Sequence, residues 1–144
     1  MNKLILFILF TTSFNLFAAD YQQEIDKFFK LYQAGKITEA IDSVYSTNEY
    51  VSAIPDQIKN VKTQLSALEG LVGQVHHISK LDTFLVGDAF VYVTYLATYD
   101  RQPVRYEFQF FKVKEGWRIY SFSFDDDLSE IQSQARKAAW SASQ

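Results

Sequence analysis

The sequence predicts an α+β domain in which N-terminal helices pack on an antiparallel sheet of about four strands, followed by a short C-terminal helix. Apolar residues recur at helical spacing from residue 20 to about residue 70, and from residue 74 the apolar period changes to two. No repeat or linker interrupts residues 20–144. A chain of this length buries enough surface for one ordinary core, so we expect a single domain.

Residues 1–19 have the three-part layout of a cleavable signal peptide. Lys3 supplies the basic start, residues 4–10 form the apolar centre, and Ala18 and Ala19 are the small residues before Asp20. Polar residues from Thr11 onward interrupt the apolar run, which is therefore too short to span a bilayer. We expect a mature protein of residues 20–144, periplasmic or secreted, with no membrane anchor after cleavage.

Charge and cysteine content limit the classes of partner and covalent link that the chain can have. The chain has 14 basic and 17 acidic residues, a net charge of −3, and no cysteine. A mildly acidic chain without a Lys/Arg cluster lacks the electrostatic footprint of a nucleic-acid-binding protein. The absence of cysteine excludes disulfides, thiolate metal sites and lipid attachment through cysteine. Stability must therefore come from packing.

Three helices are predicted in the first half. Asp20 caps the first, with Gln23 as its capping-box partner, and Gly35 ends it. The second follows over residues 37–45, and Pro55 begins a third that ends near Gly70.

The second half predicts strands over residues 75–81, 89–99, 104–113 and 117–124. Residues 82–88 are expected to form a loop, and residues 114–116 a tight hairpin. Asp127 can cap the final helix, with Glu130 at the reciprocal position.

Large apolar side chains occupy both predicted faces of the sheet. In the second strand Phe90 and Tyr92 alternate with Val93 and Tyr95. One helical layer covers only one face, and a large exposed apolar patch usually has a use. We expect a homodimer through the uncovered face, with an interface formed by Val93, Tyr95, Tyr120 and Phe122.

The helical region through Leu68, the strand over residues 89–99 and the hairpin from Lys114 to Ile119 together resemble the nuclear transport factor-like superfamily, also called the cystatin-like cone. Within it the chain is similar to small exported bacterial proteins of unknown function. The resemblance implies helices in the hollow of a curved sheet and a pocket between the two layers. It suggests a ligand pocket formed by His77, Tyr92, Tyr106, Phe108 and Phe110.

Residues that could carry chemistry are few. His76 and His77 are adjacent, so on a strand they point to opposite faces and do not readily share a metal ion. One of them could act as a base in a pocket, or both could be structural. The acidic run at residues 125–127 lacks the spacing of a calcium loop and suits a helix start better. We assign no catalytic residue, no metal ligand and no cofactor.

The superfamily includes isomerases, dehydratases, ligand carriers and dimerisation modules, so the resemblance does not choose among them. The leading interpretation is an exported, non-enzymatic binding or interaction module that takes an apolar small molecule. The alternative is a small-molecule isomerase or dehydratase with His77 or His76 as its base. A third interpretation is a subunit that helps another exported protein to assemble.

Overall fold

The computed structural model describes residues 20–143. The predicted signal peptide lies outside these residues and stays a prediction. The elements, in chain order, are α1 Tyr21–Gln33, α2 Ile37–Tyr45, the short helix η1 Glu49–Ala53, α3 Pro55–Val72, β1 Val75–Val86, β2 Phe90–Tyr99, β3 Pro103–Val113, β4 Gly116–Asp125 and α4 Ser129–Ala142.

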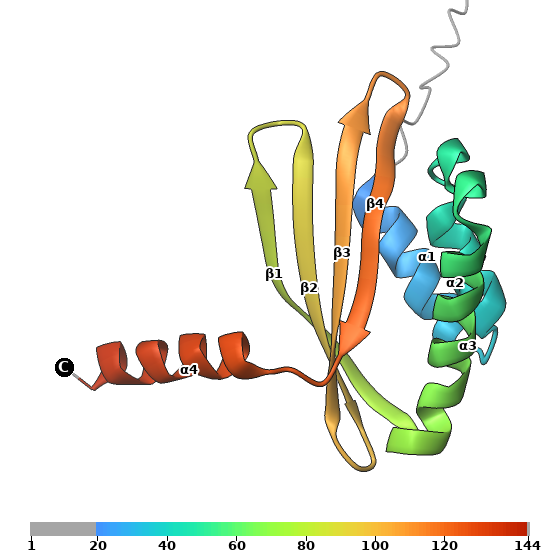
Figure 1. The fold of residues 1–144 in the computed structure, drawn as a ribbon. Helices are drawn as coiled ribbons and strands as arrows, with labels where there is room; N and C mark the ends of the chain where they lie inside the picture. The colour runs from blue at the N-terminus through green and yellow to red at the C-terminus, as the bar shows by residue number, and fades with distance from the viewer. Residues whose placement is uncertain (1–19, 144) are drawn as a thin grey trace, which may run out of the picture.

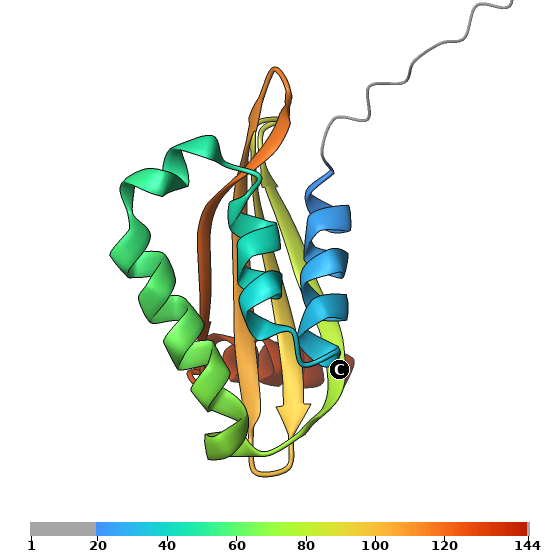
Figure 2. The same ribbon diagram turned by 90° about the vertical axis from the view of Figure 1, so that its right-hand side faces the viewer.

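The four strands form one antiparallel sheet in the order β1-β2-β3-β4. Helices α1, α2 and α3 all lie on one side of it, and α4 lies on the other side (Figures 1 and 2). Short hairpins join neighbouring strands, and the predicted hairpin at Lys114 and Glu115 is present as the link between Val113 and Gly116. The α+β prediction is confirmed.

The first helix begins as its sequence indicates. The Asp20 carboxylate accepts a hydrogen bond from the Gln22 amide nitrogen at 3.1 Å, which satisfies one of the free donors at the helix start. Ile25, Phe28, Phe29 and Tyr32 then form a buried stripe against the sheet. The helix is amphipathic because these residues recur at three- and four-residue intervals.

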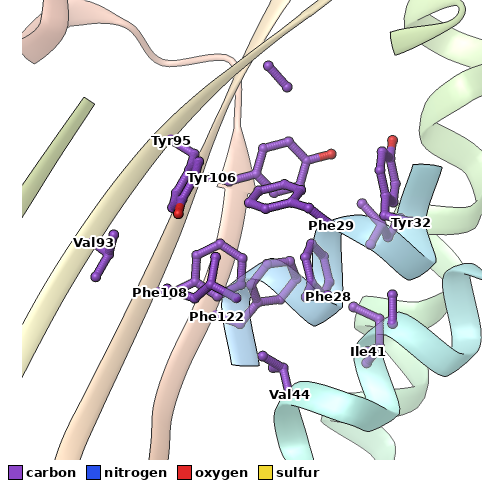
Figure 3. Packing of buried hydrophobic residues seen from close by; sticks show 14 of the residues in the cluster. Phe28, Phe29, Tyr32, Ile41, Val44, Val93, Tyr95, Tyr106, Phe108 and Phe122 are labelled. Carbon is purple, nitrogen blue, oxygen red and sulfur yellow. The ribbon is translucent and has the colours of Figure 1, made fainter. Parts of the chain in front are cut away.

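The two faces of the sheet are now distinguishable. We call the side under α1–α3 the covered face and the opposite side the free face. Buried residues of β2, β3 and β4 point to the covered face: Val91, Val93, Tyr95, Ala97, Tyr99, Val104, Tyr106, Phe108, Phe110, Ile119 and Phe122. Figure 3 shows Phe28 and Phe29 of α1 among rings from β2, β3 and β4. Phe28 lies 5.2 Å from Phe108 and 5.0 Å from Phe122 between ring centroids.

Three irregular positions explain where the sequence prediction of the sheet fails. The pairing register shifts at His76, at Leu81 and at Tyr120, and each is an extra residue on its strand. A β-bulge of this kind breaks the strict alternation of side chains. The bulge at Leu81 hides the continuation of β1 in the sequence pattern. The loop predicted at residues 82–88 is therefore wrong for residues 82–86, where the strand continues to Val86, while Gly87 and Asp88 do form a turn.

Two helix boundaries also differ. Helix α3 runs to Val72 rather than ending near Gly70, and Gly73 follows it with a positive φ of 89°. Helix α4 begins at Ser129 rather than directly after Asp127, although the Asp127 carboxylate does accept a hydrogen bond from the Ser129 amide at 3.0 Å. Among residues 20–143, no helix is long and apolar enough to cross a membrane.

Candidate functional site

A cleft of about 410 Å³ lies between the helices and the sheet, where the end of α1, the middle of α3 and the start of β1 meet. Its size is within the range of small-molecule pockets. The wall combines apolar and polar side chains and is formed by Tyr32, Gln33, Ala34, Gly35, Ile37, Leu65, Ser66, Glu69, Gly73, Gln74, Val75 and Tyr99. The cleft is therefore mixed in character, whereas the sequence predicted an apolar pocket.

Gly73 allows the backbone to close one wall of the cleft. Its φ of 89° lies in a region that residues with a Cβ rarely adopt, and a Cβ there would come within 2.3 Å of the Asp100 carboxylate. The same carboxylate accepts a hydrogen bond from the Gln74 amide nitrogen at 2.7 Å. This close approach turns the chain from α3 into β1, and it places Gln74 and Val75 at the cleft.

Three tyrosine hydroxyls lie in a row at the inner end of the cleft. The Tyr32 hydroxyl is 2.7 Å from that of Tyr99, which is 2.5 Å from that of Tyr106. All three side chains are buried, and Tyr32 and Tyr99 line the cleft. We call this row the tyrosine chain. It joins α1, β2 and β3, so it links the helical layer to the sheet.

The tyrosine chain has one proton more than its two hydrogen bonds use, since each hydroxyl donates one. Tyr106 is fully buried, and among the described residues its hydrogen-bond partners are tyrosine hydroxyls. A buried donor without an acceptor is costly, so Tyr106 donates to Tyr99 and Tyr99 donates to Tyr32. The remaining proton is then on Tyr32, which lines the cleft and can donate it to Tyr106 or to an acceptor in the cleft.

Burial keeps this chain in its neutral form. Desolvation raises the pKa of Tyr99 and of Tyr106 far above the ordinary tyrosine value, and the Glu69 carboxylate contributes to the shift at Tyr99. The hydroxyls are therefore hydrogen-bond donors and acceptors rather than bases at neutral pH. Glu69, which is exposed on α3, adds a carboxylate acceptor to the same cleft.

The structure separates the five predicted pocket residues. Tyr106 belongs to the tyrosine chain, while Phe108 and Phe110 are fully buried in the core. Tyr92 pairs with Gln109 on the free face, so placing it in one pocket with the other rings is wrong. His77 is exposed on β1 and does not line the cleft.

His76 has a hydrogen-bonded partner, but not at the cleft. Its Nε2 is 2.6 Å from an Asp100 carboxylate oxygen, and both side chains are about half exposed. Hydrogen bonds from the Gln74 amide and from His76 lower the pKa of Asp100. The pair holds the bulge at the start of β1 to the turn after β2.

The predicted interface residues also divide between the two faces. Val93, Tyr95 and Phe122 are buried under the helices, where Tyr95 receives a hydrogen bond from Gln22 of α1 at 2.8 Å. Tyr120 is 68% exposed and contacts Phe90, which lies on the free face. The prediction of one shared surface is wrong because the bulge at Tyr120 puts Phe122 on the other side of the sheet.

A polar cluster occupies the centre of the free face. Arg105 contacts the carboxylates of Asp125 at 2.9 Å and Glu107 at 3.4 Å. Burial and the neighbouring Glu107 carboxylate raise the pKa of Tyr92 to about 12. Beside this cluster, a second pocket of about 320 Å³ is closed on one side by Ile131 in the first turns of α4.

Sequence reasoning missed Tyr32, Tyr99 and Glu69. The available signal was tyrosine at positions where the helical stripe and the strand alternation demand burial. A buried tyrosine usually needs a partner for its hydroxyl. Three such positions could have indicated a shared polar feature inside the core.

In comparisons with known proteins, no family model and no curated protein matches the sequence. Two solved structures are similar to the chain. One is described as a candidate calcium/calmodulin-dependent protein kinase type II association domain from Thiobacillus denitrificans, with 12% identity, a TM-score of 0.49, and coverage of 74% of this chain and 94% of that chain. The other is a phospholipid-binding protein from Ralstonia solanacearum in complex with a phospholipid, with 15% identity, a TM-score of 0.45, and coverage of 76% and 79%. At these scores, only the chain's own residues bear on its function.

Proposed function

We propose that this protein is an exported, non-enzymatic binding module that holds a small molecule in the cleft between α1, α3 and β1. The observation that carries the proposal is the tyrosine chain, because its end at Tyr32 lines the cleft and can donate a hydrogen bond there. A ligand group that accepts a hydrogen bond there would complete a network that is otherwise buried.

The other wall residues define the rest of the ligand. Ile37, Leu65 and Val75 offer apolar contacts, while Glu69 offers a carboxylate at the rim. A molecule with a small apolar body and a carbonyl, ether or acidic group at its inner end suits this wall. The predicted apolar ligand is thus refined to an amphipathic one.

The enzyme alternative finds less support. A base must come within hydrogen-bond reach of the proton that it removes. Neither His76 nor His77 lines the cleft. Burial raises the pKa of Tyr99, which does line the cleft, so its hydroxyl keeps its proton at neutral pH and does not act as a base. Binding therefore accounts for the site with fewer additional groups.

Fluorescence titration with anilinonaphthalene sulfonate tests the proposal, since this probe combines apolar rings with an acceptor group. We expect Ser66→Trp to abolish binding, because Ser66 is an exposed residue of α3 that lines the cleft. The matched control is Thr63→Trp, which is exposed on the same helix but does not line the cleft. Equal probe binding by the two variants would disprove the cleft as the site.

A second variant tests the hydrogen bond itself. Tyr32→Phe removes the hydroxyl at the cleft and keeps the ring in the core. One net hydrogen bond is worth about 0.5–1.5 kcal/mol, so we expect the dissociation constant of the probe to rise about two- to twelvefold. The exposed Tyr50→Phe serves as the control. Native mass spectrometry of the mature protein from its own cell envelope would then identify a retained ligand and test export.

A further inference from the structure

The free face of the sheet exposes apolar side chains that no helix within residues 20–143 covers. Phe84 is 63% exposed, Val86 is 55% exposed and Tyr120 is 68% exposed. Phe84 and Val86 pair with Tyr92 and Phe90, so their side chains are on the free face. Exposed apolar groups gathered on one face usually mark an interaction surface.

Most of helix α4 in turn lacks a surface to pack against within the described residues. It stands on the free-face side, and its C-terminal end points away from the sheet (Figures 1 and 2). None of its 14 residues is buried, and Trp140 is 70% exposed. A helix of roughly 12–15 residues is marginal in water without packing. The first turns of α4 line the pocket on the free face through Ile131, but the rest of the helix needs a surface that the described residues of its own chain do not supply.

We propose that two copies of this chain associate around a two-fold axis, each laying its α4 on the free face of the other. Each copy has one uncovered face and one unpacked helix, so a symmetric pair satisfies both needs at once. The proposal does not depend on ligand binding at the cleft. It differs from the predicted interface, because Val93, Tyr95 and Phe122 remain inside each copy.

The charges on the two surfaces are complementary. After Glu130, the charged residues of the chain are Arg136 and Lys137, both in α4. The free face has an excess of carboxylates, since Asp82, Glu107 and Asp125 face a single guanidinium, that of Arg105.

Electrostatic complementarity guides which surfaces associate and in which orientation. Here it favours the basic end of α4 over the acidic part of the sheet. The dimensions agree as well. Trp140 is about 17 Å along the helix from Ser129, at about 1.5 Å per residue. Tyr120 is about 17 Å along β4 from Asp125, at about 3.3 Å per residue.

The exposed apolar area is of the order that a dimer interface buries. An aromatic side chain can bury about 150–250 Å², so Phe84, Tyr120 and Trp140 at roughly two-thirds exposure offer about 300–500 Å² per copy. A standard interface buries about 800 Å² per partner. Val86, Leu81 and the alanines of α4 supply further apolar surface.

The open edge of β1 is a weaker docking surface for a second copy. The bulges at His76 and Leu81 interrupt its regular hydrogen-bonding pattern. Bulges and edge lysines such as Lys80 commonly prevent edge-to-edge pairing. The free face is regular across β2 and β3, where the register runs without a shift.

Sedimentation velocity of residues 20–144 at about 1 to 100 µM, the range in which weak dimers dissociate, tests the proposal. We expect the wild type to dimerise, and Trp140→Lys and Tyr120→Glu each to raise the dimer dissociation constant at least tenfold. The control is Leu71→Lys, which changes an equally exposed residue of α3 on the other side of the molecule. Thermal melting checks that all three variants remain folded.

Mixing the two interface variants distinguishes exchange of helices from stacking of two sheets. In a mixed dimer, one Trp140 meets an intact free face, and at the second contact the introduced lysine meets the introduced glutamate. We therefore expect the mixture to dimerise more tightly than either variant alone.

Three outcomes would overturn the proposal. The first is a wild type that stays monomeric at the highest concentration. The second is a dimer weakened by Tyr120→Glu but not by Trp140→Lys, which would indicate sheets stacked without α4. The third is a dimer that neither variant weakens, which would indicate another surface such as the β1 edge.

Discussion

The covered and free faces of the sheet come from the same strands, yet they differ in how their aromatic residues are used. On the covered face, Tyr106, Phe108 and Phe122 are buried against α1, with Phe108 and Phe122 only 5.0 Å apart between ring centroids. On the free face, Phe84 and Tyr120 are mostly exposed, beside an ion cluster around Arg105. Aromatic content alone therefore does not identify the core.

The polar residues of β3 identify the core side of the sheet better than aromatic content does. Arg105, Glu107 and Gln109 alternate with buried residues, so they mark the free face of their own strand. The register then extends that assignment to the neighbours, because directly paired residues share a face. One strand with clear alternation thus assigns the faces of the strands beside it.

The largest expected effect compares the same substitution on the two faces. Phe108→Ala should lower the free energy of unfolding by about 3–5 kcal/mol, the usual loss for a buried phenylalanine. Phe84→Ala should cost less than about 1 kcal/mol in the monomer, because its ring is already largely in water. Urea denaturation at low protein concentration measures both. Similar losses would show that the two faces do not differ as described.

A smaller effect concerns the hydroxyls on each face. Tyr106→Phe should cost about 1–2 kcal/mol, because it removes a donor from the buried tyrosine chain and leaves Tyr99 with one partner fewer. Tyr92→Phe on the free face should cost under about 1 kcal/mol, since water can replace its contact with Glu107. The same denaturation experiment ranks them. A larger loss for Tyr92 would reverse the comparison.

The smallest effect is seen at alkaline pH. The pKa of Tyr92 is raised from its ordinary value of 10.0 to about 12, so the native state keeps this proton after the unfolded chain has lost it. Its contribution to stability is present below pH 10 and is lost as the pH rises toward 12. Tyr92→Phe should remove a step near pH 12 from the ultraviolet titration of phenolate. Tyr106→Phe should leave that step in place, because burial raises the pKa of Tyr106 further.

The sequence predicted most of the fold because the helical stripes and the strand alternation are local patterns. It failed at residues 82–86 and at Tyr120, where a bulge changes the alternation and only the pairing with a neighbouring strand reveals the shift. The cleft was harder still. Tyr32, Tyr99 and Tyr106 are distant along the chain, and their contact depends on how α1 packs over the sheet.

The bulge at Tyr120 can be understood as a one-residue insertion in an otherwise regular strand. Ile119 pairs with Phe110, and Ser121 pairs with Gln109. A strand without Tyr120 would therefore keep the same partners on β3, with no shift in the pairing register. Ile119 would also keep its backbone hydrogen bonds to Thr47 and Asn48, the residues that follow α2. The pairing register between β4 and β3 therefore tolerates loss of this residue. A chain that lacks Tyr120 should fold with an unchanged core, and it would lose only the ring that the insertion adds to the free face.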